Sequence, residues 1–391
     1  MKAIARSLAV ILVALFAVPA LVVSVTITSA VQLLAAVTGL YMGGTQHPLS
    51  VPPDTNQFIS DYMDLADDNY IVPGTGVTPN NRVPVVYPAE VAPFSPFLST
   101  STLDDSVLAG RNNLGSCLGG GSCNGGGPVE ADHFIVYGYS LSAVVASLVK
   151  GDLIDEADPA MDGTNIVLLS NPLRQNGGIL GRGFQGLTIP GIGITFYGET
   201  PNSCDTDQCS PTDDFVLPTV DVAQQYDILG GDAPARLDPL AFANSIAAYA
   251  LLHGNMPNRS IAGVGQIPTD RNVIYQDMYG DTTFYMVTAP QLPILMLATQ
   301  AGVPGPVLAI PDALMRVWIE DKYRRDLSPG EHVQFQLSPI GNPVALVGNM
   351  LGAIPVGIDD TVQQAGGGFR PLGTADVYRP FGVGGPVYDK T

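Results

Sequence analysis

Residues 133–147 read HFIVYGYSLSAVVAS. They predict a short apolar strand, a sharp turn that carries Ser140, and a helix of small and β-branched residues. Gly138 and Ser142 stand two positions before and after Ser140, where large side chains would clash as the backbone turns from strand into helix. This is the layout of a nucleophile elbow, although glycine is more usual at the position of Ser142. The alternative is a turn in an ordinary βα unit.

The composition narrows the class of protein. The 391 residues suffice for a sizeable core, and only 14% of them are charged whereas 46% are hydrophobic. The net charge is −19 and no basic patch stands out, which argues against nucleic acid as a partner. The 44 glycines and 33 prolines predict many turns and long loops.

The four cysteines lie in two close pairs, Cys117 with Cys123 and Cys204 with Cys209. Two local pairs predict two small disulfides, which persist only in an oxidising compartment. A four-cysteine zinc site is the alternative. Neither pair has the C-x-x-C spacing typical of such sites, so we expect no bound metal.

The first 35 residues suggest export. Lys2 and Arg6 precede a run without charge from Ser7 to Ala35, which is long enough to cross a bilayer. We expect residues 8–35 to anchor the protein in the membrane, with the rest of the chain on the extracytoplasmic side. A cleaved signal peptide, cut after residues 28–30, is the alternative.

Predicted strands and helices alternate from residue 37 to residue 253, which indicates a mostly parallel sheet with helices on both faces. The strands are expected at 37–42, 83–87, 133–139, 165–170 and 216–226, and the helices at 102–113 and 239–252. The apolar stretch 283–318 has two interpretations. It forms a lid or a groove for an acyl chain, or it contributes only to ordinary core packing. Residues 341–391 form a tail that is rich in glycine and proline and weakly periodic, and we expect it to be partly disordered, from about residue 360.

A serine hydroxyl is a poor nucleophile unless a base accepts its proton and an acid orients that base. In α/β-hydrolases the acid and the histidine follow the serine along the chain, so His47 and His133 are excluded by order. His253, just past a predicted helix, is the expected base and His332 the alternative. Asp227 ends a predicted strand and is the expected acid, and Asp232 is the alternative.

A glycine-rich turn, residues 43–48, follows the first predicted strand. In hydrolases with a nucleophile elbow, a turn at this place supplies half of the oxyanion hole. We expect the other half from the backbone N–H of Leu141, with the turn contributing a donor from Thr45 or Gln46. This chemistry requires no cofactor.

Several ordered motifs resemble those of the mycobacterial PE-PPE-domain serine hydrolases over residues 36–340. They are Gly43-Gly44-Thr45, Gly138-Tyr139-Ser140-Leu141-Ser142, Asn171-Pro172 with Asn176-Gly177-Gly178, Tyr226-Asp227 with Asp232, Asn244 through His253-Gly254, and Leu292-Pro293 with Gly302-Val303-Pro304-Gly305-Pro306. The resemblance implies a cutinase-like α/β-hydrolase fold and action on acyl esters. It also implies that Ser140 is the nucleophile, with Asp227 and His253 in the other two roles.

The chain departs from the family pattern in three places. The run 226–232 lacks the family's usual tryptophan, which keeps both aspartates open as the acid. The cysteine loop 116–127 looks like an insertion. A hydrophobic segment stands in place of a PE or PPE helical module, which is similar to the anchored subgroup that moves acyl chains between trehalose glycolipids.

These observations predict three regions: a membrane segment at 1–35, a hydrolase domain at 36–340 and a tail at 341–391. The expected function is an exported serine acyltransferase that moves fatty acyl chains between cell-envelope glycolipids. An esterase or lipase with the same triad is the first alternative, and a non-catalytic envelope protein with a hydrolase fold is the second. The expected partner is an acyl-lipid or glycolipid substrate.

Overall fold

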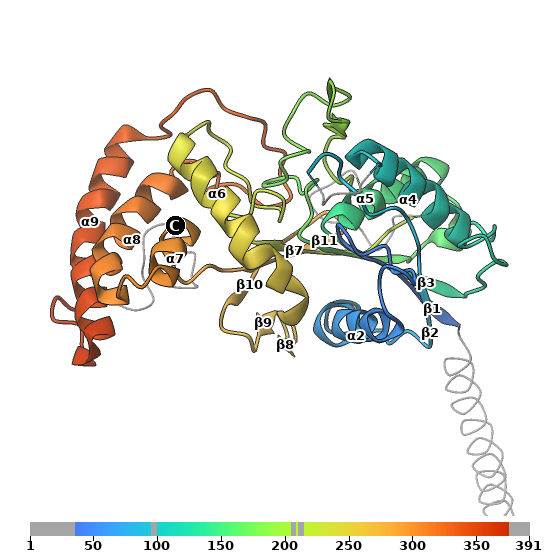
Figure 1. The fold of residues 1–391 in the computed structure, drawn as a ribbon, viewed down its shortest axis with the longest axis horizontal. Helices are drawn as coiled ribbons and strands as arrows, with labels where there is room; N and C mark the ends of the chain where they lie inside the picture. The colour runs from blue at the N-terminus through green and yellow to red at the C-terminus, as the bar shows by residue number, and fades with distance from the viewer. Residues whose placement is uncertain (1–35, 95–99, 205–208, 210–214, 375–391) are drawn as a thin grey trace, which may run out of the picture.

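A computed structural model of the protein describes residues 36–94, 100–204, 209 and 215–374. Its centre is a seven-stranded sheet with the order β10-β11-β7-β4-β3-β1-β2 (Figure 1). The strands are β1 (Val37–Met42), β2 (Asn81–Pro84), β3 (His133–Tyr139), β4 (Asn165–Leu169), β7 (Thr219–Gln224), β10 (Val273–Tyr279) and β11 (Thr282–Val287). Neighbouring strands are parallel except for the antiparallel pair β10–β11. The prediction of a mostly parallel sheet is therefore confirmed.

The strands at the centre of the sheet are buried and largely apolar because both faces of the sheet are covered. In β1, Leu40 and Met42 belong to the core on one face, whereas Tyr41 belongs to the core on the other. In β3, Val136 belongs to the first of these cores and Ile135 to the second. Successive side chains of a strand point to opposite faces, so one run of residues builds both cores.

Helices α4 (Leu103–Leu118) and α5 (Leu141–Glu156) cover one face of the sheet. Helix α2 (Asn56–Ala66) and the turns η1 (Asp67–Ile71) and α3 (Val72–Thr75) lie on the opposite side (Figure 1). Thr102 begins α4 with a capping box, and Thr55 caps α2 through its hydroxyl. The helices flank the sheet on both faces, as predicted.

The chain after β7 supplies helix α6 (Pro239–Leu252), which ends in the 3₁₀ turn η3 (His253–Asn258). Asp238 caps α6 by accepting a hydrogen bond from the N–H of Ala241, and Pro239 occupies the first helical position. Short pieces complete the fold: η2 (Pro159–Met161), the pair β5 (Thr188–Ile189) and β6 (Ile194–Thr195), and the pair β8 (Gly263–Val264) and β9 (Ile267–Pro268).

The apolar stretch 283–318 divides into three elements. Its first residues form β11, a buried strand of the central sheet. The remainder forms α7 (Pro293–Gln300) and α8 (Gly305–Glu320). Leu292 and Ile319 pack with Tyr226 in a separate small core, so this part of the stretch contributes ordinary packing.

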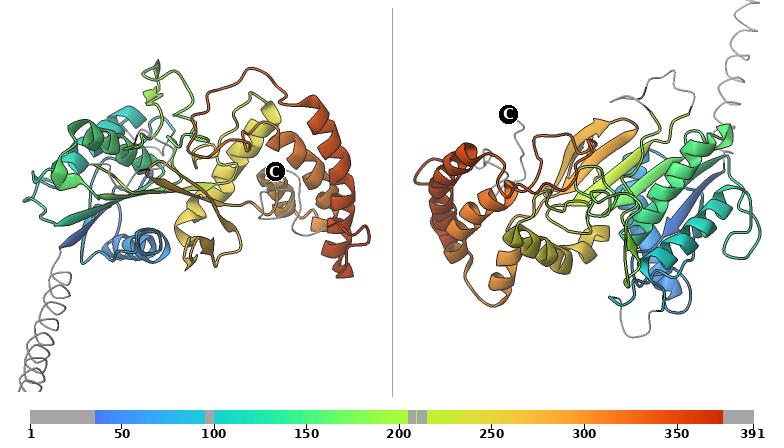
Figure 2. Two further views of the ribbon diagram at one scale, coloured as in Figure 1. Left: turned by 180° about the vertical axis from the view of Figure 1, so that it is seen from behind. Right: turned by 90° about the horizontal axis from the view of Figure 1, so that it is seen from above.

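The first part of the predicted tail forms a helix that its weak periodicity did not indicate, α9 (Pro343–Val362), which is followed by η4 (Gln363–Gly367). Asn342 caps α9. The helix packs along α8 through Leu346 and Val356 against Val317 (Figure 2). Gly357 allows the close approach, since a Cβ there would lie 2.8 Å from the backbone of Ile310. Gly357 therefore serves helix packing.

The predicted membrane segment, residues 8–35, lies outside the described residues. Among the residues that the structure does describe, no helix combines the length and apolarity needed to cross a bilayer. The structure joins Cys117 to Cys123 and Cys204 to Cys209 as disulfides.

Candidate active site

Ser140 occupies the turn between β3 and α5, with φ 59° and ψ −114°. A residue other than glycine rarely adopts a positive φ, and this strained turn is what presents the nucleophile in an elbow. Gly138 makes the turn possible, because a Cβ there would lie 2.6 Å from the carbonyl oxygen of Ser142. The local sequence thus produces the elbow that it predicts.

Ser142 replaces the usual glycine without disturbing the turn. Its fully buried hydroxyl accepts a hydrogen bond from the N–H of Tyr139 (2.8 Å) and lies 3.0 Å from the carbonyl oxygen of Met42. The side chain therefore ties the elbow to the end of β1. A glycine could not supply this link.

His253 lies between Ser140 and Asp227. Its Nε2 is 2.8 Å from the Ser140 hydroxyl, and its Nδ1 is 2.6 Å from Oδ2 of Asp227. Asp227 is fully buried and His253 is 8% exposed, so water hardly competes for these bonds. The structure thus brings the three predicted triad residues together in the order serine, histidine, aspartate.

Two tyrosines enclose the imidazole of His253. The ring of Tyr139 stacks on it at a centroid distance of 5.4 Å, and the ring of Tyr249 lies at 4.8 Å. Burial, followed by the charge of Asp227, raises the pKa of both tyrosines, so both phenols stay protonated at neutral pH. The hydroxyl of Tyr139 donates to the backbone carbonyl of His253 (2.7 Å), which fixes the residue that carries the base.

Asp232, the alternative acid, has other partners. Both of its carboxylate oxygens accept hydrogen bonds from Arg325, and Oδ2 also accepts from the N–H of Tyr226 (2.7 Å). The contact with His253 is made by Asp227 instead. Of the two aspartates, Asp227 is thus the one that contacts His253, and Asp232 pairs with Arg325.

His332, the alternative base, is also placed elsewhere. Its Nδ1 bonds to Glu199, and both side chains are partly exposed. It is absent from the residues that line the pocket at Ser140. His332 is therefore not brought to the nucleophile.

The pocket above Ser140 has a volume of about 460 Å³. It lies where the carboxyl ends of β1 and β3 meet helices α2 and α6, as expected for a ligand site on a parallel sheet. Its wall has apolar members (Phe58, Tyr62, Leu65, Tyr139, Tyr249 and Pro257) and polar members (Gln46, His47, Asp61 and Asn258). The pocket can therefore hold a molecule with an apolar part and a polar part.

The predicted oxyanion donors lie at this pocket. Leu141 is the first residue of α5, and the first N–H groups of a helix have no acceptor within the helix. Thr45 and Gln46 both line the pocket, but the backbone N–H of Gln46 donates to the carbonyl oxygen of Ala89 (2.7 Å). The backbone N–H of Gln46 therefore has another acceptor, and Thr45 remains the candidate backbone donor of this turn.

Sequence reasoning missed a second histidine that lines this pocket and pairs with a carboxylate behind it. Nδ1 of His47 lies 2.8 Å from Oδ1 of Asp54, and His47 lines the pocket that contains Ser140. Order along the chain excluded His47 only as the triad base. The available signal was its position in the turn after β1. Because β1 lies parallel to β3 and next to it, this turn lies at the same edge of the sheet as Ser140.

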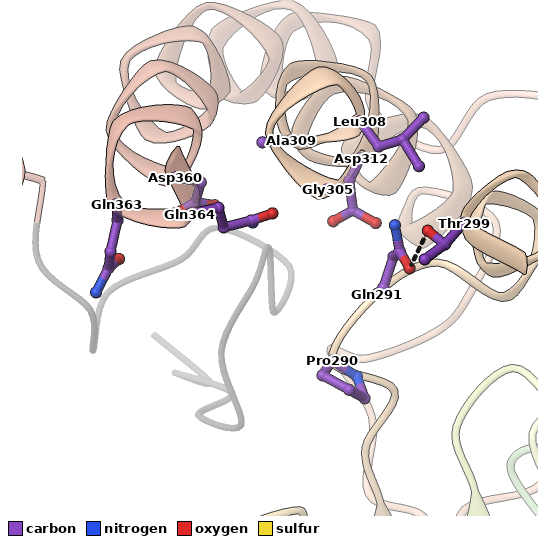
Figure 3. Close-up of a pocket in the computed structure, with 10 residues that line it drawn as sticks. All are labelled: Pro290, Gln291, Thr299, Gly305, Leu308, Ala309, Asp312, Asp360, Gln363 and Gln364. Carbon is purple, nitrogen blue, oxygen red and sulfur yellow. Dashed lines mark hydrogen bonds between the residues drawn. The ribbon is translucent and has the colours of Figure 1, made fainter. Parts of the chain in front are cut away.

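A second pocket of about 300 Å³ lies among the C-terminal helices (Figure 3). Asp312 and Asp360 reach it, but the first pairs with Arg316 and the second with Arg370. No serine, cysteine or histidine is among its lining residues. Within the described ranges, no group of three or more His, Cys, Asp or Glu side chains is placed to bind a metal ion. The Ser140 pocket is therefore the candidate site.

Comparison with known proteins agrees with these motifs. Residues 78–324, more than half of the chain, match the family described as PE-PPE domain. Three proteins of Mycobacterium tuberculosis are each 28% identical to this chain. They are the uncharacterized PPE family proteins PPE42 (84% of this chain, 52% of the relative) and PPE28 (83% and 46%), and Esterase PE16 (88% and 60%).

The chain spans about half the length of the curated relatives it matches. The matched region includes the elbow at Ser140 as well as Asp227 and His253. On this match the chain belongs to the PE-PPE domain family.

Proposed function

We propose that the protein is a serine esterase that cleaves acyl esters through an acyl-enzyme on Ser140. The observation that carries the proposal is His253, whose two ring nitrogens lie 2.8 Å from the Ser140 hydroxyl and 2.6 Å from Asp227. The 28% identity with Esterase PE16 supports the same reaction class.

In this mechanism Nε2 of His253 accepts the proton as the Ser140 oxygen attacks the ester carbonyl. Asp227 stabilises the imidazolium that forms, and the N–H groups of Leu141 and Thr45 would stabilise the oxyanion. The imidazolium then protonates the departing alcohol. Water, or a second alcohol, attacks the acyl-enzyme with His253 again as base, and the proton returns to Ser140.

A second candidate is acyl transfer, in which the hydroxyl of a glycolipid replaces water. The polar side chains of Gln46, Asp61 and Asn258 beside Ser140 favour it, because they offer hydrogen bonds to a sugar. Both activities use the same triad and are separated by their products. Incubation with an acylated sugar would release free fatty acid in the first case and form a more highly acylated sugar in the second. The assembled triad argues against a non-catalytic role.

We also propose that the protein acts outside the cytoplasm, anchored through residues 8–35, on acyl lipids. The two disulfides support this location because such bonds persist in oxidising compartments. Membrane fractionation of cells that express the full chain, with and without residues 1–35, would test it.

The variant Ser140→Ala tests the nucleophile. We expect turnover of a p-nitrophenyl acyl ester to fall by at least about a thousandfold, because the remaining groups cannot form the acyl-enzyme. The melting temperature should stay near that of the wild type, since the change removes one hydroxyl. Turnover at the wild-type rate would refute the proposed function.

A further inference from the structure

The pocket at Ser140 contains a second imidazole that the proposed reaction does not use. Asp54, which is 7% exposed, holds this ring through Oδ1, 2.8 Å from Nδ1 of His47. The other carboxylate oxygen of Asp54 accepts a hydrogen bond from the N–H of Leu49 (2.9 Å). Both oxygens therefore have partners, and the carboxylate is fixed in its loop.

This arrangement determines which nitrogen of His47 is available. An ionised carboxylate can only accept, so Nδ1 of the neutral ring carries the proton and Nε2 is left as an acceptor. The ring also stacks on Phe58 at a centroid distance of 4.4 Å. The side chain of His47 is 45% exposed although its partner is buried. The ring is therefore held by a buried carboxylate and is still accessible to a ligand.

The surroundings of His47 indicate what this nitrogen would bind. Gln46, Asp61 and Asn258 line the same pocket, and all three can bond a hydroxyl group. Asp61 and the net charge of −19 disfavour an anion. The expected ligand is therefore uncharged and carries hydroxyl groups. In an ester substrate, the part that can carry such groups is the alcohol part.

We propose that His47, positioned by Asp54, binds a free hydroxyl of the alcohol part of the ester and so favours esters of polyols over esters of simple alcohols. This inference rests on the proposed function of Ser140. His47 exchanges no proton with the substrate, because His253 carries the proton from Ser140 to the departing alcohol. His47 is thus a specificity-determining residue that acts through one hydrogen bond.

Two soluble esters with the same acyl chain test the inference on the full chain. Monobutyrylglycerol carries free hydroxyls next to the ester, and propyl butyrate carries none. We expect the wild type to prefer the glycerol ester in kcat/KM, and His47→Phe to reduce that preference about fivefold, the effect of one lost neutral hydrogen bond. The ratio of the two values cancels any difference in the amount of folded enzyme.

Further variants keep the test decisive if His47→Phe does not fold. His47→Gln retains groups that bond a hydroxyl and should keep more of the preference. Asp54→Ala removes the carboxylate that holds the His47 ring in place, which should lower the preference. His332→Phe is the matched control, because it removes a histidine that pairs with a carboxylate outside the pocket.

Equal preference in the wild type and in the His47 and Asp54 variants would overturn the inference. So would a wild type that does not distinguish the two esters. The proposed function would survive both results if Ser140→Ala still abolished turnover of a p-nitrophenyl ester. Retained turnover in Ser140→Ala would instead remove the basis of both.

Discussion

The two oxygens of the Asp227 carboxylate have different partners, and the function proposed for this residue depends on both. Oδ2 lies 2.6 Å from the imidazole of His253, whereas Oδ1 accepts from the N–H of Leu229 (3.0 Å). The second bond sets the plane of the carboxylate. Gly230 must remain without a side chain, because a Cβ there would lie 2.5 Å from Oδ2.

The variant Gly230→Ala should therefore impair catalysis although it lies outside the triad. The added methyl group pushes the Asp227 carboxylate away from His253, and a misplacement of about 1 Å can cost on the order of 100-fold in rate. The measurement is kcat/KM on a p-nitrophenyl ester. Gly115→Ala is the control, since a Cβ on Gly115 meets nothing within 4 Å. Unchanged activity of folded Gly230→Ala would contradict this account.

The burial of His133 predicts that the protein becomes less stable in acid. Burial lowers the pKa of His133 below its ordinary value, and its Nε2 lies 2.7 Å from the side-chain amide of Asn165. The unfolded chain thus binds the proton more readily, so the free energy of unfolding falls as the pH drops through about 6.5. We expect the melting temperature to fall between about pH 7.5 and 5.5, and to fall less in His133→Gln. An equal fall in both proteins would rule out this residue as the cause.

The loop between β7 and α6 carries Asp227 and is held by a buried cluster at its back. Arg325 donates to Asp232 and, through Nε, to Glu320 (2.8 Å). Glu320 also accepts from the hydroxyl of Tyr226 (2.7 Å), the residue just before the acid. Tyr226 has a φ of 68°, a conformation that needs such support. The cluster thus holds the loop in the form that aims Asp227 at His253.

The motif at residues 171–178 supports the same loop. The N–H of Ala233 donates to the carbonyl of Gly177 (2.8 Å), and a Cβ on Gly177 would lie 2.0 Å from the carbonyl oxygen of Gly231. The two loops therefore fit together only with glycine at this position.

Two neighbouring arginines allow a direct test of the cluster. Arg325→Met removes the cation that pairs with the buried carboxylates of Asp232 and Glu320, which should lower the free energy of unfolding by about 3–5 kcal/mol. Arg324→Met removes an exposed pair with Asp326 and should cost less than about 1 kcal/mol. Urea unfolding of both variants gives the comparison. Similar losses in the two would mean that the cluster does not stabilise the loop.

At the scale of the molecule, the helices α7, α8 and α9 lie to one side of the sheet, away from α4 and α5 (Figure 2). Helix α9 covers Ala313 and Val317 of α8, which are 1% and 0% exposed. Without α9 these residues would face water. The C-terminal helix is therefore part of the folded molecule, although Ser140, Asp227 and His253 all precede it.

Removal of α9 should lower the melting temperature of the protein, although it removes no residue of the triad. We expect a chain that ends at residue 341 to melt at least several degrees below a chain that ends at residue 374, because burial of the apolar residues at the α8–α9 contact is lost. Residues 375–391 are missing from both chains, so the two differ only in residues 342–374, which contain α9 and η4. Thermal unfolding followed by circular dichroism is the measurement. Equal melting temperatures would show that α9 does not stabilise the rest of the molecule.

The sequence by itself determined the elements close to Ser140. The apolar run at 133–139, the small residues around the elbow and the order of Ser140, Asp227 and His253 all act over short distances or along the chain. Strand β3, helix α6 and the parallel sheet follow from such local patterns. The same reasoning missed helix α9 at 343–362, because a stretch rich in glycine and proline shows little helical periodicity until the helix that packs against it is known.

Only the tertiary structure decided which polar groups meet. Asp227 and Asp232 are five residues apart and chemically alike, and the choice between them depends on Arg325, almost a hundred residues further along, which neutralises one of them. His47 likewise lines the pocket of Ser140 because β1 lies beside β3 in the sheet. The physical reason is that a buried charge requires a partner, and the fold rather than the local sequence brings that partner within reach.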